Sequence, residues 1–317
     1  MDLLDDALAL AGVRGTAALR IEAGRGWGIT WARNADAVLY AVAAGNAWVT
    51  AEGADGEPLS VDLGPGDVVL LPTGVAHSIA DDAHRTPRPC DTAATDDLRR
   101  VGEPLRLGAG ESRTRLLGAS YRHDRVVSLH VLNLLPPVVH IRANRADGAL
   151  DDTVRMITRE TASPRPGTQV VLDRLVDIVL VQVLRGWLDS NPGLSRGSWI
   201  GALADPLVSD AMVRMHERPA RPWTTERLAQ ELAVSRSTLT RRFQDATGQN
   251  PAEYLTRWRM DLAARQLRDT DTGIDTVARS VGYTSVHAFN RAFHRTRGLP
   301  PARFRTTSRE TPVAAAT

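Results

Sequence analysis

Between residues 224 and 305 the apolar positions follow one helical pattern twice. In the first copy Leu228 and Leu232 lie four residues apart, and so do Leu239 and Phe243. Residues four apart share one face of a helix, so each pair predicts an amphipathic helix. The pattern recurs 49 residues later at Val277, and 50 residues later at Phe289 and Phe293. The copies therefore differ by one residue between their helices, which favours a repeated helix–turn–helix unit.

Polar residues fit the turns and the outer faces of both copies. Ser235, and Thr284 or Ser285, can cap the second helix of each copy, and Gly282 suits a tight turn. Once the apolar residues face inward, the exposed side chains are Arg236, Ser237, Thr240, Arg241 and Gln244 in the first copy and Val286, His287, Asn290, Arg291 and His294 in the second. Such side chains can reach base edges in a major groove. The alternative is a helical bundle with solvated arginines, which the repetition disfavours.

Residues 13–80 show a different pattern, with short alternating segments separated by glycines. This pattern is typical of a β-domain. The predicted strands are Thr16–Ala23, Trp27–Arg33, Ala37–Ala43, Asn46–Glu52, Pro58–Asp62 and Asp67–Leu71.

The stretch Leu63–His77 resembles the second sequence motif of cupin β-barrels: Gly66, five residues, Pro-x-Gly, two residues and His77. A cupin metal site needs a His-x-His pair and a Glu as well, because zinc or iron takes three or four such ligands. Residues 36–45 contain no His-x-His, and Tyr40 stands where related barrels often have His. We expect no metal and no cofactor here. Tyr40, Trp48 and His77 are instead predicted to line a barrel lumen that binds a small effector.

The segment that follows is less regular. Residues 81–112 are rich in Asp, Arg, Pro and Thr, which predicts a flexible loop. Arg113–Tyr121 and Arg125–Leu132 are predicted strands. His123, His130 and His140 are spaced too widely for a local metal motif, so we interpret them as structural or solvent-facing.

Thr168–Leu188 is the longest predicted helix, and it is apolar nearly all round. Such a helix must be covered on several sides. Packing on its own β-domain and a dimer interface are both compatible with the pattern. We further expect a short helix at Met1–Gly12, a linker at Asn191–Ser198, a helix at Trp199–Glu217 and a disordered tail from Thr306.

Charge divides the chain into two halves. Residues 1–198 hold 21 Arg against 25 Asp and Glu, a balance of −4, and residues 199–317 hold 18 Arg against 12, a balance of +6. The basic half is therefore the one suited to phosphate. The first residues lack the basic stretch of a signal peptide, and the apolar stretch 170–188 carries charges, so we expect no membrane segment. The single Cys90 makes no internal disulfide, which suits the cytoplasm.

The basic half is similar to the DNA-binding domain of the AraC/XylS transcription regulators. The resemblance is carried by Ser235-Arg236-Ser237, Arg241-Arg242-Phe243, Gly248-Gln249-Asn250-Pro251, Trp258-Arg259-Met260, Val281-Gly282-Tyr283, Ala288-Phe289, Arg291-Ala292-Phe293 and Pro300-Pro301. It implies two helix–turn–helix units joined by a helix over Pro251–Arg268. It also implies six base-reading residues: Ser237, Thr240, Arg241, His287, Asn290 and Arg291. Bidentate geometry suits arginine to guanine and asparagine to adenine.

The same resemblance implies residues that meet the DNA backbone or the scaffold. These are Ser235, Arg236, Arg242, Arg259, Arg279, Ser285 and Arg295. Contacts of this kind position a protein on DNA and specify no base.

The sequence thus predicts a multidomain α and β protein: a cupin-like β-barrel or jelly roll with helices over residues 1–160, a helical dimerisation and linker segment over 161–198, an all-α double helix–turn–helix domain over 199–306 and a tail over 307–317. We expect a sequence-specific transcription regulator of promoter DNA, controlled by a small-molecule effector. The resemblance implies a cytoplasmic, nucleoid-associated homodimer and an activator that contacts RNA polymerase, although the sign of regulation is not recorded in the sequence. The alternatives are a metal-dependent cupin enzyme with a helical appendage and an effector-free architectural DNA binder.

Overall fold

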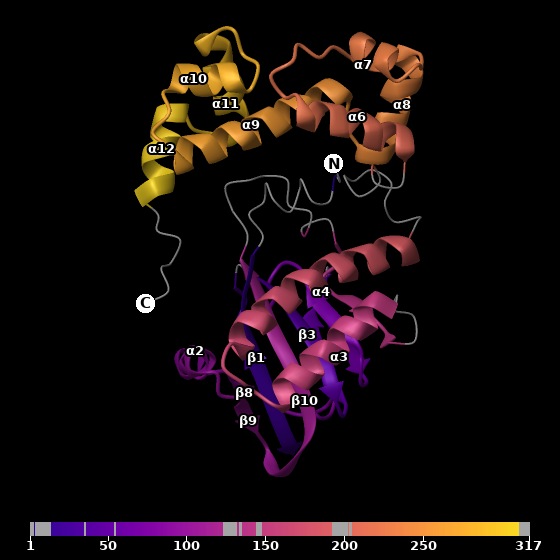
Figure 1. Ribbon diagram of the computed structural model, residues 1–317, viewed down its shortest axis with the longest axis vertical. Coiled ribbons are helices and arrows are strands. Elements are labelled where there is room, and N and C mark those ends of the chain that lie inside the picture. Colours follow the sequence, from indigo (N-terminus) through magenta and orange to yellow (C-terminus); the bar gives the residue numbers. More distant parts are fainter. Residues whose placement is uncertain are drawn as a thin grey trace. The chain divides into compact units, whose positions relative to one another are not determined.

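The computed structural model describes residues 14–34, 36–53, 55–122, 135–143, 148–191 and 205–310, together with the single residues 3, 132 and 202. The chain divides into two compact units, one within Val13–His123 and Leu135–Asn191 and the other mainly Pro192–Thr317. We call them the sensor unit and the helical unit and describe each by itself (Figure 1). The expected helix at Met1–Gly12, the strand Arg125–Leu132, His123, His130, the linker after Asn191 and the last seven residues lie outside the described residues, apart from isolated positions.

Two sheets form the sensor unit. The first contains β1 (Arg14–Arg25), β3 (Ala37–Ala44), β6 (Val68–Leu71), β9 (Leu105–Leu107), β10 (Ala109–Arg122) and β11 (Val139–Ile141), in the order β11-β6-β3-β10-β1-β9. The second contains β2 (Gly28–Trp31), β4 (Ala47–Glu52), β5 (Pro58–Leu63), β7 (His77–Ala80) and β8 (Arg88–Pro89), in the order β5-β4-β7-β2-β8. The predicted strands before residue 80 and at 113–121 are confirmed within a few residues.

The inward side chains of both sheets build one core. Tyr40, Val42 and Leu116 come from the first sheet, and Val49 and Ile79 from the second. They alternate with outward residues, as a pleated strand requires. The alternation that predicted the strands is therefore the alternation that packs them.

The prediction of a flexible loop over residues 81–112 was wrong. This segment contains β8, β9 and the helix α2 (Thr92–Val101). The Asp91 side chain accepts from the Ala94 N–H and caps the helix start, and Gly102 in the left-handed conformation ends it. Within α2 the buried residue is Thr95. Polar composition concealed a well-capped helix that buries only one narrow face.

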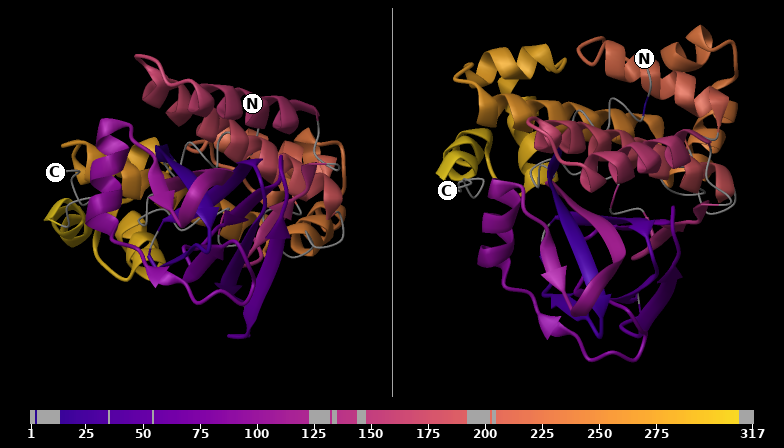
Figure 2. Two further views of the ribbon diagram at one scale, coloured as in Figure 1. Left: turned by 90° about the horizontal axis from the view of Figure 1, so that it is seen from below. Right: turned by 60° about the horizontal axis from the view of Figure 1, so that its bottom comes forward.

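Helices α3 (Gly148–Ala162) and α4 (Thr168–Ser190) complete the sensor unit. Figures 1 and 2 show both lying against the sheet that holds β1, β3 and β10. The buried Tyr121 hydroxyl donates to the Val176 carbonyl oxygen at 2.6 Å, and the Gly15 N–H donates to the Asp177 carboxylate at 2.8 Å. The predicted helix over 168–188 thus packs on its own β-domain. Val170, Val171 and Ile178 of α4 remain exposed.

The helical unit contains α6 (Pro206–Glu217), α7 (Thr225–Glu231), α8 (Arg236–Thr247), α9 (Pro251–Asp269), α10 (Ile274–Ser280), α11 (Val286–Arg297) and α12 (Pro301–Glu310). In Figure 1 α9 joins the α6–α8 group to the α10–α12 group. The disordered tail expected from Thr306 was wrong for its first five residues, which continue α12. Arg305 donates to the Leu267 carbonyl and Arg309 to the Arg268 carbonyl, at 3.1 and 2.9 Å. Arginines that bind the last carbonyls of a helix stabilise its end, and these hold α12 against α9.

Candidate nucleic-acid interface and sensor cavity

The turns of the two helix–turn–helix units have the same hydrogen bonds. In the first, the Ala233 N–H donates to the Gln230 carbonyl and the Val234 N–H to the Ala229 carbonyl, at 3.1 and 3.0 Å. In the second, the Gly282 N–H donates to the Arg279 carbonyl and the Tyr283 N–H to the Ala278 carbonyl, at 3.0 and 2.9 Å. Each of these four residues lies 49 positions after its counterpart in the first unit. Ala233 and Gly282 both have positive φ, at 54° and 87°. The repeat seen in the sequence is thus a structural repeat down to individual backbone bonds.

The second helix of each unit begins at a serine. The Ser235 hydroxyl accepts from the Thr238 N–H at 3.0 Å, and the Ser285 hydroxyl accepts from the Ala288 N–H at 3.4 Å. The second cap therefore lies at Ser285, and Thr284 is the residue inserted between turn and cap. These caps fix where α8 and α11 start, and hence which side chains each presents.

The inner faces of α8 and α11 are buried as predicted. Leu239 and Phe243 of α8 are 0 % exposed, with Phe243 edge-on to Tyr254 of α9. Phe289 and Phe293 of α11 are also 0 % exposed, and Phe293 packs edge-on to Phe304 of α12. Because each second helix is anchored by the same two positions, the opposite face of each helix is the one left outside.

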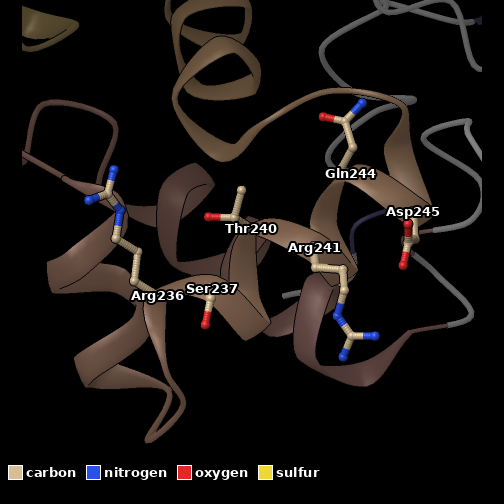
Figure 3. Close-up of a pocket in the computed structure, with 6 residues that line it drawn as sticks. All are labelled: Arg236, Ser237, Thr240, Arg241, Gln244 and Asp245. Atoms are coloured by element: carbon tan, nitrogen blue, oxygen red, sulfur yellow. The ribbon is translucent and has the colours of Figure 1, made fainter.

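The outer face of α8 forms a shallow hollow. It is lined by Arg236, Ser237, Thr240, Arg241, Gln244 and Asp245, all on α8 (Figure 3). Arg236 forms an ion pair with Glu226 at 2.8 Å. The exposed Arg241 guanidinium has no ion-pair partner among the described residues. A guanidinium left without an internal partner is available to an external acceptor.

The corresponding face of α11 carries His287, Asn290, Arg291 and His294. His287, Arg291 and His294 are exposed, and Asn290 is half-buried. The Asn290 Oδ1 is buried and makes no hydrogen bond within the described part of the chain. The structure brings all six predicted base-reading residues onto the outer faces of α8 and α11.

The seven residues expected at the DNA backbone separate into two groups. Arg242 makes a bidentate pair with Asp205, at 2.9 and 2.6 Å. Arg259 donates to the carbonyls of Pro219 and Arg221, both at 2.8 Å. These two arginines have scaffold roles, because Nε and Nη2 of each guanidinium are bonded within the fold. The second group consists of the five residues that are exposed: Ser235, Arg236, Arg279, Ser285 and Arg295.

Inside the sensor unit a cavity of about 230 Å³ opens beside Tyr40 and His77. The Tyr40 hydroxyl and His77 Nε2 lie 2.9 Å apart, and Trp31 stacks on the His77 ring at 5.2 Å. Burial lowers the pKa of His77 and raises that of Tyr40 well above its usual value, so both are neutral near pH 7. The predicted placement of Tyr40 and His77 at a lumen is thus observed.

The predicted placement of Trp48 at the lumen was wrong. In β4 the buried residues are Ala47, Val49 and Ala51, which join the core, and Trp48 alternates with them. Since successive side chains of a strand point to opposite faces, Trp48 faces away from the cavity.

Within the described residues, no group of three or more His, Cys, Asp and Glu side chains has a metal-binding arrangement. His140 instead forms a pair with Asp67 at 3.1 Å. No described helix combines the length and apolar character needed to cross a membrane.

Comparison with known proteins agrees with both units. Residues 2–189 match the cupin family model, and residues 228–307 match a helix-turn-helix domain model. A putative AraC-like transcription regulator of Streptomyces lividans is 34% identical over 309 residues, which cover 96% of this chain and 98% of that protein. The chain belongs to the AraC-type transcription regulators.

Other relatives of this AraC-type regulator carry related names. The HTH-type transcriptional regulator AlkR of Acinetobacter baylyi is 30% identical over 244 residues, which cover 76% of this chain and 79% of AlkR. Among solved structures, the DNA-binding domain of AdpA in complex with a target DNA is 32% identical; the match covers 35% of this chain and 99% of that domain, with a TM-score of 0.33. The two family models and the AraC-type relatives show a DNA-binding transcription regulator that joins a cupin domain to a helix-turn-helix domain.

Among the cavity residues of this AraC-type regulator that sequence reasoning missed are Trp31 and Arg99. Trp31 was assigned to a strand but not to the lumen, although it is two residues after Ile29 and four after Trp27, which both point into the core. Arg99 lines the cavity from α2, in the segment interpreted as a loop. The Asp91 cap and Gly102 were the available signals for that helix.

Proposed function

We propose that α8 and α11 enter two successive major grooves on one face of the DNA. Ser237, Thr240 and Arg241 would contact one groove, and His287, Asn290 and Arg291 the next. The observation that carries this proposal is the equivalence of the two outer faces: Ser237, Thr240 and Arg241 correspond to His287, Asn290 and Arg291 at an offset of 50 residues, on helices with equivalent caps and turns.

The length of the connecting helix supports the same proposal. Helix α9 has 19 residues, which corresponds to about 28 Å at 1.5 Å per residue. Successive major grooves on one face of DNA lie about 34 Å apart. A helix of this length can connect two units that occupy neighbouring grooves.

The remaining exposed residues would contact phosphate. Arg236, Arg279 and Arg295 would contribute charge, and Ser235 and Ser285 would contribute the amino ends of α8 and α11. Such contacts set the position on DNA and make affinity depend on salt.

We further propose that the cupin domain binds a small-molecule effector beside Tyr40 and His77, and that the effector controls DNA binding by preferring one arrangement of the regulator. The exposed Val170, Val171 and Ile178 of α4 would contribute to a homodimer interface. The regulator would act in the cytoplasm at the nucleoid, activate transcription through RNA polymerase and carry out no catalysis. The relatives named above are described as transcription regulators, which supports this choice over a cupin enzyme.

Selection of genomic fragments by the full-length protein, followed by footprinting of the enriched sites, tests the DNA-binding mode. We expect two protected major-groove segments about 10 base pairs apart on one face of the DNA. A single protected segment with the folded protein would contradict the two-groove proposal. An effector-free architectural protein would instead bind DNA with the same specificity whether or not the sensor unit is present. No small molecule would raise the stability of its sensor unit.

A further inference from the structure

The cavity of the sensor unit gathers side chains from both sheets and from α2. Trp31 and His77 pair directly across β2 and β7, and Tyr40 reaches toward them from β3. Gly118 of β10 lies beside Tyr40, and a Cβ there would come within 3.2 Å of the Tyr40 ring. The floor of the cavity is therefore a close-packed aromatic group, and α2 contributes the polar wall that contains Arg99.

The Tyr40–His77 pair offers the cavity no charge. His77 Nδ1 lies 2.8 Å from the Val75 carbonyl oxygen, which can only accept, so Nδ1 carries the proton. His77 Nε2 then accepts from the Tyr40 hydroxyl. Both side chains are thus satisfied and neutral, and what they leave for a ligand is a lone pair on the Tyr40 oxygen.

Arg99 is different, because it brings a permanent positive charge to the cavity. Its side chain is 24% exposed, and Nη1 donates to Asp96 at 2.6 Å. Its Nε is buried and has no hydrogen-bond partner among the described residues. A buried N–H without an acceptor is costly, and a guanidinium N–H prefers an anionic oxygen.

The acidic residues of the lining do not favour a cationic ligand. Asp96 is 66% exposed and already paired with Arg99. Asp36 lies just before β3 and is also engaged within the fold, and its backbone N–H donates to the Asn34 side-chain oxygen at 2.9 Å. Among the lining side chains described by the structure, the buried polar atom that lacks a partner is a donor, Arg99 Nε. The complementary group on a ligand is an acceptor.

Size limits the ligand further. A volume of about 230 Å³ corresponds to roughly eight water molecules at about 30 Å³ each. This volume suits a small organic molecule of about ten non-hydrogen atoms. The Trp31 face adds a preference for a flat apolar body.

We propose that the cavity binds a small, flat organic monocarboxylate, with the carboxylate on Arg99 and the apolar body beside Trp31. This inference rests on the proposed sensor function of the cupin domain. Because Arg99 lies on α2, the bound carboxylate joins α2 to the barrel, and binding protects the backbone amides of residues 92–101 from hydrogen exchange.

Calorimetric titration of the full-length protein with four probes tests the ligand class. Benzoate is flat and anionic, benzamide is flat and neutral, benzylamine is flat and cationic, and cyclohexanecarboxylate is anionic but puckered. We expect benzoate to bind at least tenfold more tightly than each of the others. Equal or tighter binding of benzamide or benzylamine would overturn the proposal, as would the absence of benzoate binding to folded protein.

Arg99→Gln should weaken benzoate binding at least tenfold and abolish the protection of residues 92–101. Arg100→Gln is the matched control, because Arg100 is the next residue of α2, is 69% exposed and pairs with Asp97 outside the cavity lining. Arg99→Lys keeps the charge and should retain part of the affinity, which separates loss of a ligand contact from loss of the α2 fold. Unchanged benzoate affinity in Arg99→Gln would refute the assignment of Arg99.

A screen of neutral, cationic and anionic compounds by thermal shift separates this inference from the sensor proposal. A ligand without a carboxylate, whose binding is lost in Trp31→Leu, would overturn the carboxylate class while retaining the sensor function. If no compound binds to folded protein, both proposals fail.

Discussion

Ala233 and Gly282 occupy the same position in the two turns, both in the left-handed region of backbone space, at φ 54° and 87°. Only the glycine is also enclosed: a Cβ at residue 282 would lie 2.8 Å from Arg259 Nη2 and 2.9 Å from the Ala220 carbonyl oxygen. The first turn therefore accepts a side chain at the cost of backbone strain. The second has no room for one.

This difference predicts unequal effects on stability when each residue is replaced by the other. Gly282→Ala should destabilise the helical unit by about 2–3 kcal/mol, because left-handed strain of about 1–2 kcal/mol adds to the clash. Ala233→Gly should change stability by less than about 1 kcal/mol, since relief of strain is offset by the extra freedom of unfolded glycine. Hydrogen exchange of α7, α8, α10 and α11 in the full-length variants measures both. Equal losses would show that the two turns are not differently constrained.

Arg259 connects the segment before the first unit to the turn of the second. Its guanidinium donates to the carbonyls of Pro219 and Arg221 and lies 5.9 Å from the Tyr283 ring. We predict that Arg259→Met lowers affinity for DNA with both half-sites about tenfold or more, because charge-assisted bonds of about 1.5–3 kcal/mol hold the two units in register. Affinity for DNA with one half-site should change little.

Binding titrations on both DNAs, with Arg265→Met as control, check this prediction. Arg265 lies on the same helix and pairs with Asp269 at 3.7 Å. An equal loss on both DNAs would indicate damage to a single unit rather than loss of register.

The pair Arg295 and Arg242 separates phosphate contact from scaffold. Arg295 is exposed without an ion-pair partner among the described residues, whereas Arg242 is bound to Asp205. If about six phosphates are neutralised, the slope of log affinity against log salt should be near −5. Arg295→Ala should bring that slope about one unit closer to zero for every DNA sequence. Arg242→Ala should leave it unchanged and reduce hydrogen-exchange protection of α6 and α8; a changed slope in this variant would contradict its scaffold role.

His216 gives the helical unit a dependence on pH. It stacks on Trp258 with ring centroids 3.5 Å apart and lies 2.7 Å from the Tyr254 hydroxyl, and burial lowers its pKa to about 3. An unfolded histidine titrates near 6.5, so between about pH 6.5 and 3 the unfolded state binds the extra proton. The contribution of neutral His216 to the free energy of unfolding is therefore fully present above pH 6.5 and declines as the pH falls below that value.

From pH 7.5 to 5.5 the loss should be about 1.4 kcal/mol. Hydrogen exchange of α6 and α9 at the two pH values measures it, after correction for the intrinsic exchange rate. His216→Phe keeps an aromatic ring but cannot titrate, so its pH dependence should be smaller by that amount. The same dependence in both proteins would assign the effect to other groups.

Much of this fold follows from local pattern. In β4 buried and less buried residues alternate, and β6 is a short apolar run between two glycines. The helices around Leu239 and Phe289 have apolar residues at the same repeated spacing. The Trp48 error was avoidable, because Trp48 alternates in step with Thr50 and Glu52 rather than with Ala47 and Val49. Since every second residue of a strand points to the same face, the sequence already placed Trp48 on the polar face.

Other features depend on contacts that sequence spacing does not encode. Arg242 is paired with a residue 37 positions away, and Arg259 with carbonyls 40 and 38 positions away. Their arginine-rich surroundings resemble those of an exposed DNA-contacting residue. Helix α2 was missed because its composition is that of a loop, and the residues that define it are its two caps.

Selection of binding sites from a randomised DNA pool tests the central claim most directly, with the full-length protein and its Arg241→Ala and Arg291→Ala variants. If α8 and α11 each read one groove, each variant should lose preference at one base position, in a different half of the site, at a cost of roughly 1–3 kcal/mol. If either variant instead loses affinity equally for all sequences, that arginine contacts phosphate. The account of two reading helices would then be contradicted for that unit.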